Sequence, residues 1–435
     1  MIGGSMKMTS RFAMVAAAGV LLGAAVTSAK AADLGGGCCA DLEERVAELE
    51  ATTARKGNRV VSLQVYGQVN KALLFFDDGV DSDAYIVDND YSGSRVGFVG
   101  SAALKPGWKA GFLVELDIQD ASSNLVDNGG AAAAVFDDPA DEIVIRYSNV
   151  YVESEKFGRI TLGQGSTAGD GAYEVVLGNS LRNSDLHVGN GFFLRDGVAD
   201  ATPGFSNIKL SGLASNFDAG RDDVIRYDSP SIYGFILSAS WGDDDYADVA
   251  LRFKKEWNSV RIAAAVSYQW DDSRDGQNNA NPNSPVPLDP NNIANAEFET
   301  IGGSISVMHI PTGIYGALAG AEKELQSGVS AGESASYWYA QLGIEKKFLS
   351  YGSTTVYAEY GLYDDVLTIT NVTGVSSEAE RWGFGVVQKF DSAALELYAQ
   401  ATFWSFEAST LAGETVQDQD LEDLSTIMIG SRIKF

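Results

Sequence analysis

The chain has 435 residues, with 31 basic and 59 acidic side chains and a formal net charge of −28. This excess of acid excludes sequence-independent nucleic-acid binding as the main activity, because such binding requires many basic contacts to phosphate. Apolar residues make up an ordinary 45% of the chain, which excludes a helical membrane bundle. The two cysteines, Cys38 and Cys39, are adjacent, which excludes a disulfide framework.

The first 31 residues have the pattern of a secretory signal peptide. Lys7 and Arg11 precede the apolar run Phe12–Val26, and the small residues of SAKA, 28–31, follow it. The run is shorter than the roughly 20 residues that a membrane-spanning helix needs. Cleavage after residue 31 removes three basic residues and no acidic ones, so the mature chain carries a net charge of −31.

Residues 32–59 are predicted to form a short periplasmic N-terminal helix and a linker. Two heptads are too short to be stable alone. The helix is therefore predicted either to lie against the rest of the protein and fray, or to form a small bundle where several subunits meet. The seam of that bundle would consist of Leu42, Val46, Leu49 and Thr53.

From residue 60 onward, apolar and polar residues alternate with period two, which indicates β-strands with different surroundings on their two faces. The segment WKAGFLVELDI, residues 108–118, is the clearest case. One of its faces carries Lys109, Glu115 and Asp117. The other face is entirely apolar and consists of Trp108, Ala110, Phe112, Val114, Leu116 and Ile118. Such a strand is predicted to face water on one side and lipid on the other.

Sixteen strands of this kind are predicted. Short turns, such as 105–107 and 155–158, alternate with long loops, such as 120–142 and 271–296, and the third long loop, 165–221, is the longest. This alternation and an even strand number are typical of outer-membrane barrels, whereas a soluble sandwich keeps most loops short. The predicted strands cover residues 61–75, 93–104, 108–119, 143–154, 159–164, 222–229, 232–241, 246–256, 260–270, 298–308, 314–324, 334–346, 354–363, 380–390, 394–404 and 425–435.

Tryptophans mark both rims of this predicted barrel. Trp241 and Trp270 end strands that lead to long loops, whereas Trp108 and Trp257 lie beside short turns. Residues 60–435 are therefore predicted to form an all-β fold, a 16-stranded antiparallel transmembrane β-barrel. Its last strand, which ends at Phe435, is expected to pair with the first, because no hydrogen-bonding edge can face lipid.

Several motifs of the mature chain resemble those of Gram-negative general porins, specifically the alphaproteobacterial porin family. They are VYGQVN, SRVGFVG, FGRITLGQG before the longest loop, RYDSPSIYGF after it and the terminal IKF, and CCADLEERVAELE resembles that family's N-terminal helix. The resemblance implies a homotrimer in the outer membrane, in contact with lipid and lipopolysaccharide, with the third loop folded into the lumen. The ending at Phe435 resembles the signal that the barrel assembly machinery reads.

The resemblance also implies a pore constriction in which acidic residues of the third loop face basic residues of the wall. Asp170 and Glu174 are the candidate acids, with Asp185 and Asp196 further along the loop. The alternative is that these carboxylates only solvate the loop, as charged loop residues usually do.

Four wall residues belong to the same predicted constriction. Arg95 matches the wall arginine of the family's motif, and alternation directs both Arg95 and Arg226 inward. Gln68 stands where the family usually has lysine, and Gln164 stands where it usually has arginine. Arg95 also has a simpler interpretation, as a wall residue without influence on conduction.

These features predict a water-filled channel for passive diffusion of small hydrophilic solutes and ions, with mild cation selectivity from the acidic charge. No catalytic residue, cofactor or metal is expected. The acidic stretches DDDYAD, 243–248, and DQDLED, 418–423, are predicted to be solvated loop tips, because they lack the glycine and the terminal glutamate of a calcium loop. A substrate-specific outer-membrane channel is the main alternative, and an adhesin or an outer-membrane enzyme are the others.

A further expectation concerns Ala32, the first residue of the predicted mature chain. Some related alphaproteobacterial barrels begin with Ala-Asp, as the mature chain would with Ala32 and Asp33, and are joined covalently to peptidoglycan through that end. The alternative is an unattached periplasmic segment.

Overall fold

The structure is a computed structural model, which describes residues 61–118, 121–129, 143–181, 184, 188–197, 204–242, 246–271, 297–327, 331–371, 373–412 and 415–435. The predicted signal peptide and N-terminal helix lie outside these ranges, as do Ala32, Asp185 and both cysteines. All described residues belong to one compact unit of the chain, which begins at Val60.

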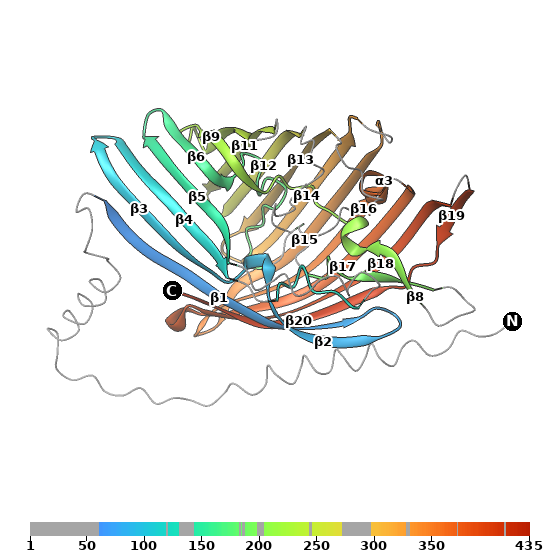
Figure 1. The fold of residues 1–435 in the computed structure, drawn as a ribbon. Coiled ribbons are helices and arrows are strands. Elements are labelled where there is room, and N and C mark those ends of the chain that lie inside the picture. Colours follow the sequence, from blue (N-terminus) through green and yellow to red (C-terminus); the bar gives the residue numbers. More distant parts are fainter. Residues whose placement is uncertain are drawn as a thin grey trace. The chain divides into compact units, whose positions relative to one another are not determined.

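Within the described residues, sixteen antiparallel strands form the wall of one closed barrel (Figure 1). Each strand pairs with its neighbours in chain order, as hairpin connections require. The strand number and order confirm the predicted fold. The strands are β1 (Ser62–Asp77), β3 (Arg95–Lys105), β4 (Trp108–Ile118), β5 (Ile143–Ser154), β6 (Gly158–Ser166), β9 (Arg221–Asp228), β10 (Phe235–Gly242), β11 (Ala247–Trp257), β12 (Val260–Asp271), β13 (Phe298–His309), β14 (Ile314–Leu325), β15 (Ser334–Leu349), β16 (Gly352–Asp364), β17 (Gly374–Phe390), β18 (Leu395–Ala412) and β20 (Leu424–Lys434).

The connections carry shorter elements of their own. β2 continues the wall beside β1, and β19 continues it beside β18, so parts of two predicted loops are strand. In the described part of the chain, no helix has the length and apolar character needed to cross a membrane. These elements are β2 (Ser82–Asp88), η1 (Asp90–Ser92), β7 (Phe193–Asp196), β8 (Gly204–Lys209), η3 (Leu210–Gly212), α3 (Val366–Thr370), η4 (Asp391–Ala393) and β19 (Thr415–Gln419).

The barrel closes where β1 meets β20. Their register runs from the pair Gln68 and Lys434 to the pair Asp77 and Ser425. One step below, the backbones of Gly67 and Phe435 exchange two hydrogen bonds of 3.0 Å each. Every backbone group along this seam therefore has a partner, as an apolar surrounding demands.

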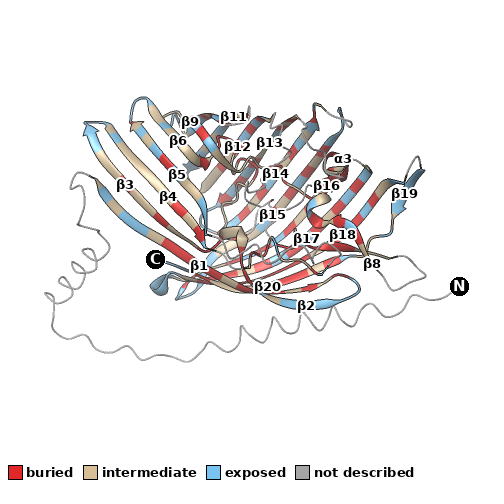
Figure 2. Cartoon of the chain, in the orientation of Figure 1, coloured by how far each residue is buried: buried red, intermediate tan, exposed pale blue. Residues whose placement is uncertain are grey.

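The two faces of the wall differ as the alternation predicts. On β14, Leu318 is 58% exposed, whereas the preceding Ala317 is 5% exposed and Tyr315 is 1% exposed. The same change recurs along most strands and appears as alternating colours in Figure 2. The exposed row is apolar, so this outer face suits a lipid bilayer, while the inner face is covered by other parts of the chain or lines the lumen.

The third loop connects β6 to β9 and folds back along the inner wall. Its backbone N–H groups donate to wall side chains: Val175 to Ser304 Oγ at 2.9 Å, and Leu177 to Ser306 Oγ at 3.1 Å. Both serines belong to β13, which is far from β6 in the barrel order. The predicted inward course of this loop is confirmed. Its described residues are 167–181, 184, 188–197 and 204–220.

The second half of the third loop forms an apolar core with the wall. β7, β8 and η3 contribute side chains that pack in one cluster with α3 and with β15, β16 and β18. This half therefore fills part of the lumen with dry contacts and leaves the water-filled part elsewhere. The central buried members are Phe192, Leu194, Leu210, Leu213, Phe217, Tyr337, Tyr363, Leu367 and Trp404.

Candidate functional site

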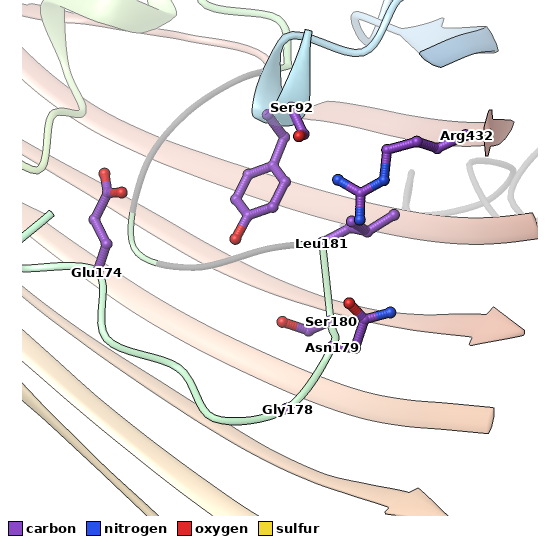
Figure 3. Close-up of a pocket in the computed structure, with 8 residues that line it drawn as sticks. Ser92, Glu174, Gly178, Asn179, Ser180, Leu181 and Arg432 are labelled. Atoms are coloured by element: carbon purple, nitrogen blue, oxygen red, sulfur yellow. The ribbon is translucent and has the colours of Figure 1, made fainter. Parts of the chain in front are cut away.

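A cavity of about 260 Å³ lies between the first half of the third loop and the opposite wall (Figure 3). It is mostly polar in its lining side chains. The loop contributes five lining residues, η1 contributes two, and β20 contributes one. They are Glu174, Gly178, Asn179, Ser180, Leu181, Tyr91, Ser92 and Arg432.

The start of the third loop is clamped to the wall by an acid and a base of β11. Asp248, 3% exposed, accepts the backbone N–H groups of Ala168 at 3.1 Å and Gly169 at 2.5 Å. Arg252 donates to the backbone oxygens of Ala168 at 2.6 Å and Asp170 at 2.7 Å. Because charged groups make strong hydrogen bonds, these contacts hold a short stretch of backbone firmly.

The predicted Arg226 belongs to the same clamp. Its Nη1 donates to the backbone oxygens of Ser166 at 3.1 Å and Thr167 at 2.7 Å. Its Nη2 pairs with Asp228 Oδ1 at 2.7 Å. Arg226 therefore holds the point where β6 ends and the loop begins, and its charge is met by a carboxylate of the same strand.

Further along, Tyr173 joins the loop to β12. Gln269 Nε2 donates to the Tyr173 hydroxyl at 3.0 Å. Burial raises the pKa of Tyr173 to about 12. The phenol therefore stays neutral at any ordinary pH, and this anchor does not depend on pH.

The tip of the loop reaches the far wall. Asn179 donates its backbone N–H to Glu345 Oε2 at 3.0 Å and its Nδ2 to Glu396 Oε1 at 3.3 Å. The preceding Gly178 lies on the ring of Tyr315, where an added Cβ would come within 2.1 Å of the ring. Only glycine allows the backbone to approach this closely.

The opposite side of the cavity is η1, which is supported from behind by two predicted residues. Gln68 Nε2 donates to the backbone oxygens of Ser92 at 2.7 Å and Gly93 at 2.8 Å. Arg95 donates through Nε to Gly93 O at 3.0 Å and through Nη2 to Ser92 Oγ at 3.2 Å. Gln68 and Arg95 therefore position the lining residues and do not line the cavity themselves.

Glu174 and Arg432 lie at opposite sides of the cavity in Figure 3. Glu174 Oε1 accepts a hydrogen bond from Asn216 Nδ2 at 2.9 Å. Arg432 Nε donates to Glu396 Oε2 at 2.6 Å, and Arg432 is 5% exposed. The cavity thus presents a carboxylate on the loop side and an arginine already bonded to a wall carboxylate on the other.

The predicted constriction residues are therefore only partly together. Glu174 lines the cavity, and Asp170 meets the clamp through its backbone oxygen. Gln164 is half-buried on β6, in register with β5 and β9, and Asp196 bridges to Leu421, so neither is among the lining residues.

Sequence reasoning missed Arg432, Asn179 and Tyr91. Arg432 alternates with the apolar row of the terminal strand, so its inward direction was readable from the sequence. Nothing local indicates that Asn179 is the loop tip or that η1 meets it, because both depend on how the loops fold across the barrel.

Among curated protein sequences, no relative matches this chain. Within the described residues, no cluster of three or more histidine, cysteine or acidic side chains is arranged to hold a metal ion.

Solved structures share the fold at low sequence identity. The in-vitro folded outer-membrane protein OmpT of Vibrio cholerae has a TM-score of 0.54 at 14% identity, over 87% of this chain and 99% of its own. Its trimer form has a TM-score of 0.53 at 15% identity, over 86% and 100%. An anion-selective porin from Comamonas acidovorans has a TM-score of 0.52 at 16% identity, over 86% and 100%.

One family matches most of the sequence. It is described as Gram-negative porin, and the match covers residues 13–409. The closed barrel, its apolar outer face and the inward third loop agree with that match. The chain belongs to the Gram-negative porin family, whose members form channels in the bacterial outer membrane.

Proposed function

We propose that the protein is a channel for passive diffusion of small hydrophilic solutes and ions, not an enzyme. The observation that carries this proposal is the cavity beside the third loop, whose lining is mostly polar although it lies inside a barrel with an apolar outer face. Such a lining suits water and polar solutes. Selection would then follow from the width of the opening and from the charges around it.

The channel is proposed to be mildly cation-selective. The mature chain carries a large excess of acid, and Glu174 places one carboxylate at the cavity. Arg226 and Arg432, the cations nearest to the loop, are each bonded to a wall carboxylate. The Comamonas neighbour is named anion-selective, so the shared fold does not set the sign of selectivity, and the residues of this chain must do so.

Planar-bilayer recordings test both parts of this proposal. Purified protein should give stepwise conductance, and the reversal potential in a potassium chloride gradient should indicate preference for potassium. A clear preference for chloride contradicts the selectivity, and a folded protein without conductance contradicts the channel. Glu174→Gln should lower the potassium preference, because it removes one charge at the cavity.

A substrate-specific channel remains the alternative function. Such channels guide a solute along an accessible stripe of side chains. The lumen does carry aromatic residues, but Tyr315, Tyr339 and Tyr363 are at most 1% exposed beneath the third loop. We therefore favour general diffusion. Liposome swelling with a series of sugars and amino acids distinguishes the two, because a general channel ranks solutes by size.

We further propose a homotrimer, by analogy with the trimer form of the Vibrio neighbour, and an origin in the alphaproteobacterial branch of the family. Assembly through the barrel machinery would use Phe435, in contact with membrane lipid and lipopolysaccharide. Native electrophoresis and cross-linking in detergent test the trimer, and a single band at the monomer mass overturns it.

Attachment of Ala32 to peptidoglycan is a separate proposal, supported by the predicted start of the mature chain. Mass spectrometry of muramidase-digested sacculi tests it. A muropeptide joined to the peptide that begins at Ala32 is expected, and its absence from sacculi that retain the barrel overturns the proposal.

A further inference from the structure

Four charged side chains gather on the inner side of three neighbouring strands. Arg95 of β3 and Arg146 of β5 lie on either side of Glu115 and Asp117, both of β4. Arg146 contacts each carboxylate at 3.0 Å, and Arg95 Nη1 lies 3.5 Å from Glu115 Oε1. The four residues, named the β4 cluster, contain two cations and two carboxylates and carry no net charge.

The acids of the β4 cluster are held in place. Glu115 Oε2 accepts the hydroxyl of Tyr66 at 2.7 Å, while Oε1 accepts Arg146 Nε. Asp117 Oδ2 accepts Arg146 Nη1 at 3.0 Å. The Glu115 side chain is 6% exposed, and that of Arg146 is 14% exposed. Because water hardly reaches these groups, salt screens their charges less than it screens surface charges.

The β4 cluster lies directly behind the cavity. Arg95 donates to Ser92 Oγ and Gly93 O, and Ser92 lines the cavity. A charge on Arg95 is thus one residue away from a passing ion. Without its acids, the cluster would present two cations at this position and would repel cations from the opening.

On the basis of the proposed channel function, we propose that Glu115 and Asp117 are specificity-determining residues. They cancel the charges of Arg95 and Arg146 and make the wall behind η1 electrically neutral. The loop carboxylate Glu174 then decides which ions are favoured. The position of Arg95 alone would suggest an attractive wall for anions, so its β4 partners reverse that conclusion.

Other charges near the cluster do not affect the comparison between variants. Arg221, at the start of β9, acts electrostatically on Arg95. Its guanidinium lies 6.0 Å from the ring of Tyr147, beside the cluster. Because Arg221 is the same in every cluster variant, it contributes to the absolute selectivity and leaves the sign of each difference unchanged.

The test uses variants that change the cluster charge in opposite directions. Glu115→Gln and Asp117→Asn each leave a net charge of +1, and Arg146→Gln leaves −1. Reversal potentials in a potassium chloride gradient should show that the potassium-to-chloride permeability ratio falls roughly twofold for the first two and rises roughly twofold for the third, as expected for one unit charge acting over several ångströms. All variants are near-isosteric, and glutamine at position 115 can still accept the hydroxyl of Tyr66.

Glu153→Gln is the matched control. Glu153 also lies on the wall and pairs with a cation, Lys109 at 3.2 Å, but its side chain is 32% exposed and far along β5 from the cluster. It should shift the ratio less than the cluster variants do. Heat-resistant migration in gels verifies that each variant is a folded barrel. If Glu115→Gln does not fold, Asp117→Asn and Arg146→Gln alone decide the outcome.

Shifts of opposite sign support the proposal. Shifts of the same sign, or no shift in variants that conduct, overturn it, because a cluster that only stabilises the wall has no reason to distinguish the sign of the charge removed. Absence of conductance in the unmodified protein contradicts the channel function itself and is thereby distinguishable from failure of this inference.

Discussion

At the scale of single residues, the width of the opening depends on Gly178. The backbone of the third loop lies on the ring of Tyr315 at this point, and no side chain fits between them. The neighbouring Asn179 is bound to two wall glutamates, so the loop can move away from the wall only by lengthening these bonds. A single methyl group is therefore enough to shift the side of the cavity that the loop provides.

Gly178→Ala is expected to change the single-channel conductance and to increase the noise of the open channel. An added Cβ would come within 2.1 Å of the Tyr315 ring, so the loop must move. Gly212→Ala, on the same loop, is the control, since an added Cβ there has no neighbour closer than 3.9 Å. The double variant with Tyr315→Ala should recover part of the change, and equal effects of the two glycine variants would contradict this explanation.

Asp248 has a comparable role at the start of the loop. Asp248→Asn removes the charge that accepts the N–H groups of Ala168 and Gly169, and each such bond contributes about 1.5–3 kcal/mol. The loop should become mobile and more sensitive to protease in the folded barrel. Asp391→Asn is the control, since Asp391 pairs with Lys347 on an exposed turn. Equal protease sensitivity of both variants would be inconsistent with the clamp.

At the scale of elements, the seam between β1 and β20 distinguishes backbone from side-chain effects. Phe435 pairs with Gly67 through its backbone, and its ring is 67% exposed. Deletion of Phe435 should lower both the heat resistance of the barrel and the yield in the outer membrane, because it removes two backbone hydrogen bonds.

Phe435→Ala retains those backbone bonds and should leave the heat resistance of refolded barrels nearly unchanged. If the ring is read during assembly, as we propose, the yield in cells should nevertheless fall. Unfolding temperatures in detergent and quantification of outer-membrane fractions measure the two effects. A heat resistance as low as that of the deletion would show that the ring itself stabilises the seam.

The strand boundaries show what an element-level pattern can predict. The wall strands appear within a few residues of their predicted positions, because period two is enforced by lipid on one side and water on the other. β17 and β18 extend further than predicted, to Gly374 and Ala412, as paired ribbons in the connections. Beyond the lipid the apolar alternation is no longer required, so the sequence there does not indicate strand.

At the scale of the whole molecule, the large negative charge should act on ions at a distance. If the cation preference comes from charges around the mouth, it should decline as salt rises, because the Debye length falls from about 10 Å at 0.1 M to about 3 Å at 1 M. Reversal potentials at a constant concentration ratio but increasing mean concentration measure this. A preference independent of salt would instead indicate that charges inside the constriction, such as Glu174, dominate.

The sequence alone determined that this protein is a barrel of sixteen strands with a long third loop, because two solvents on the two faces leave a regular pattern in every wall segment. Only the tertiary structure decided which residues meet at the opening. Gly178 and Asn179 reach Tyr315, Glu345 and Glu396 across the lumen, far away in the chain. The charge of Arg95 likewise depends on its partners on β4 and β5, since pairing between strands, and not order along the chain, sets which charges cancel.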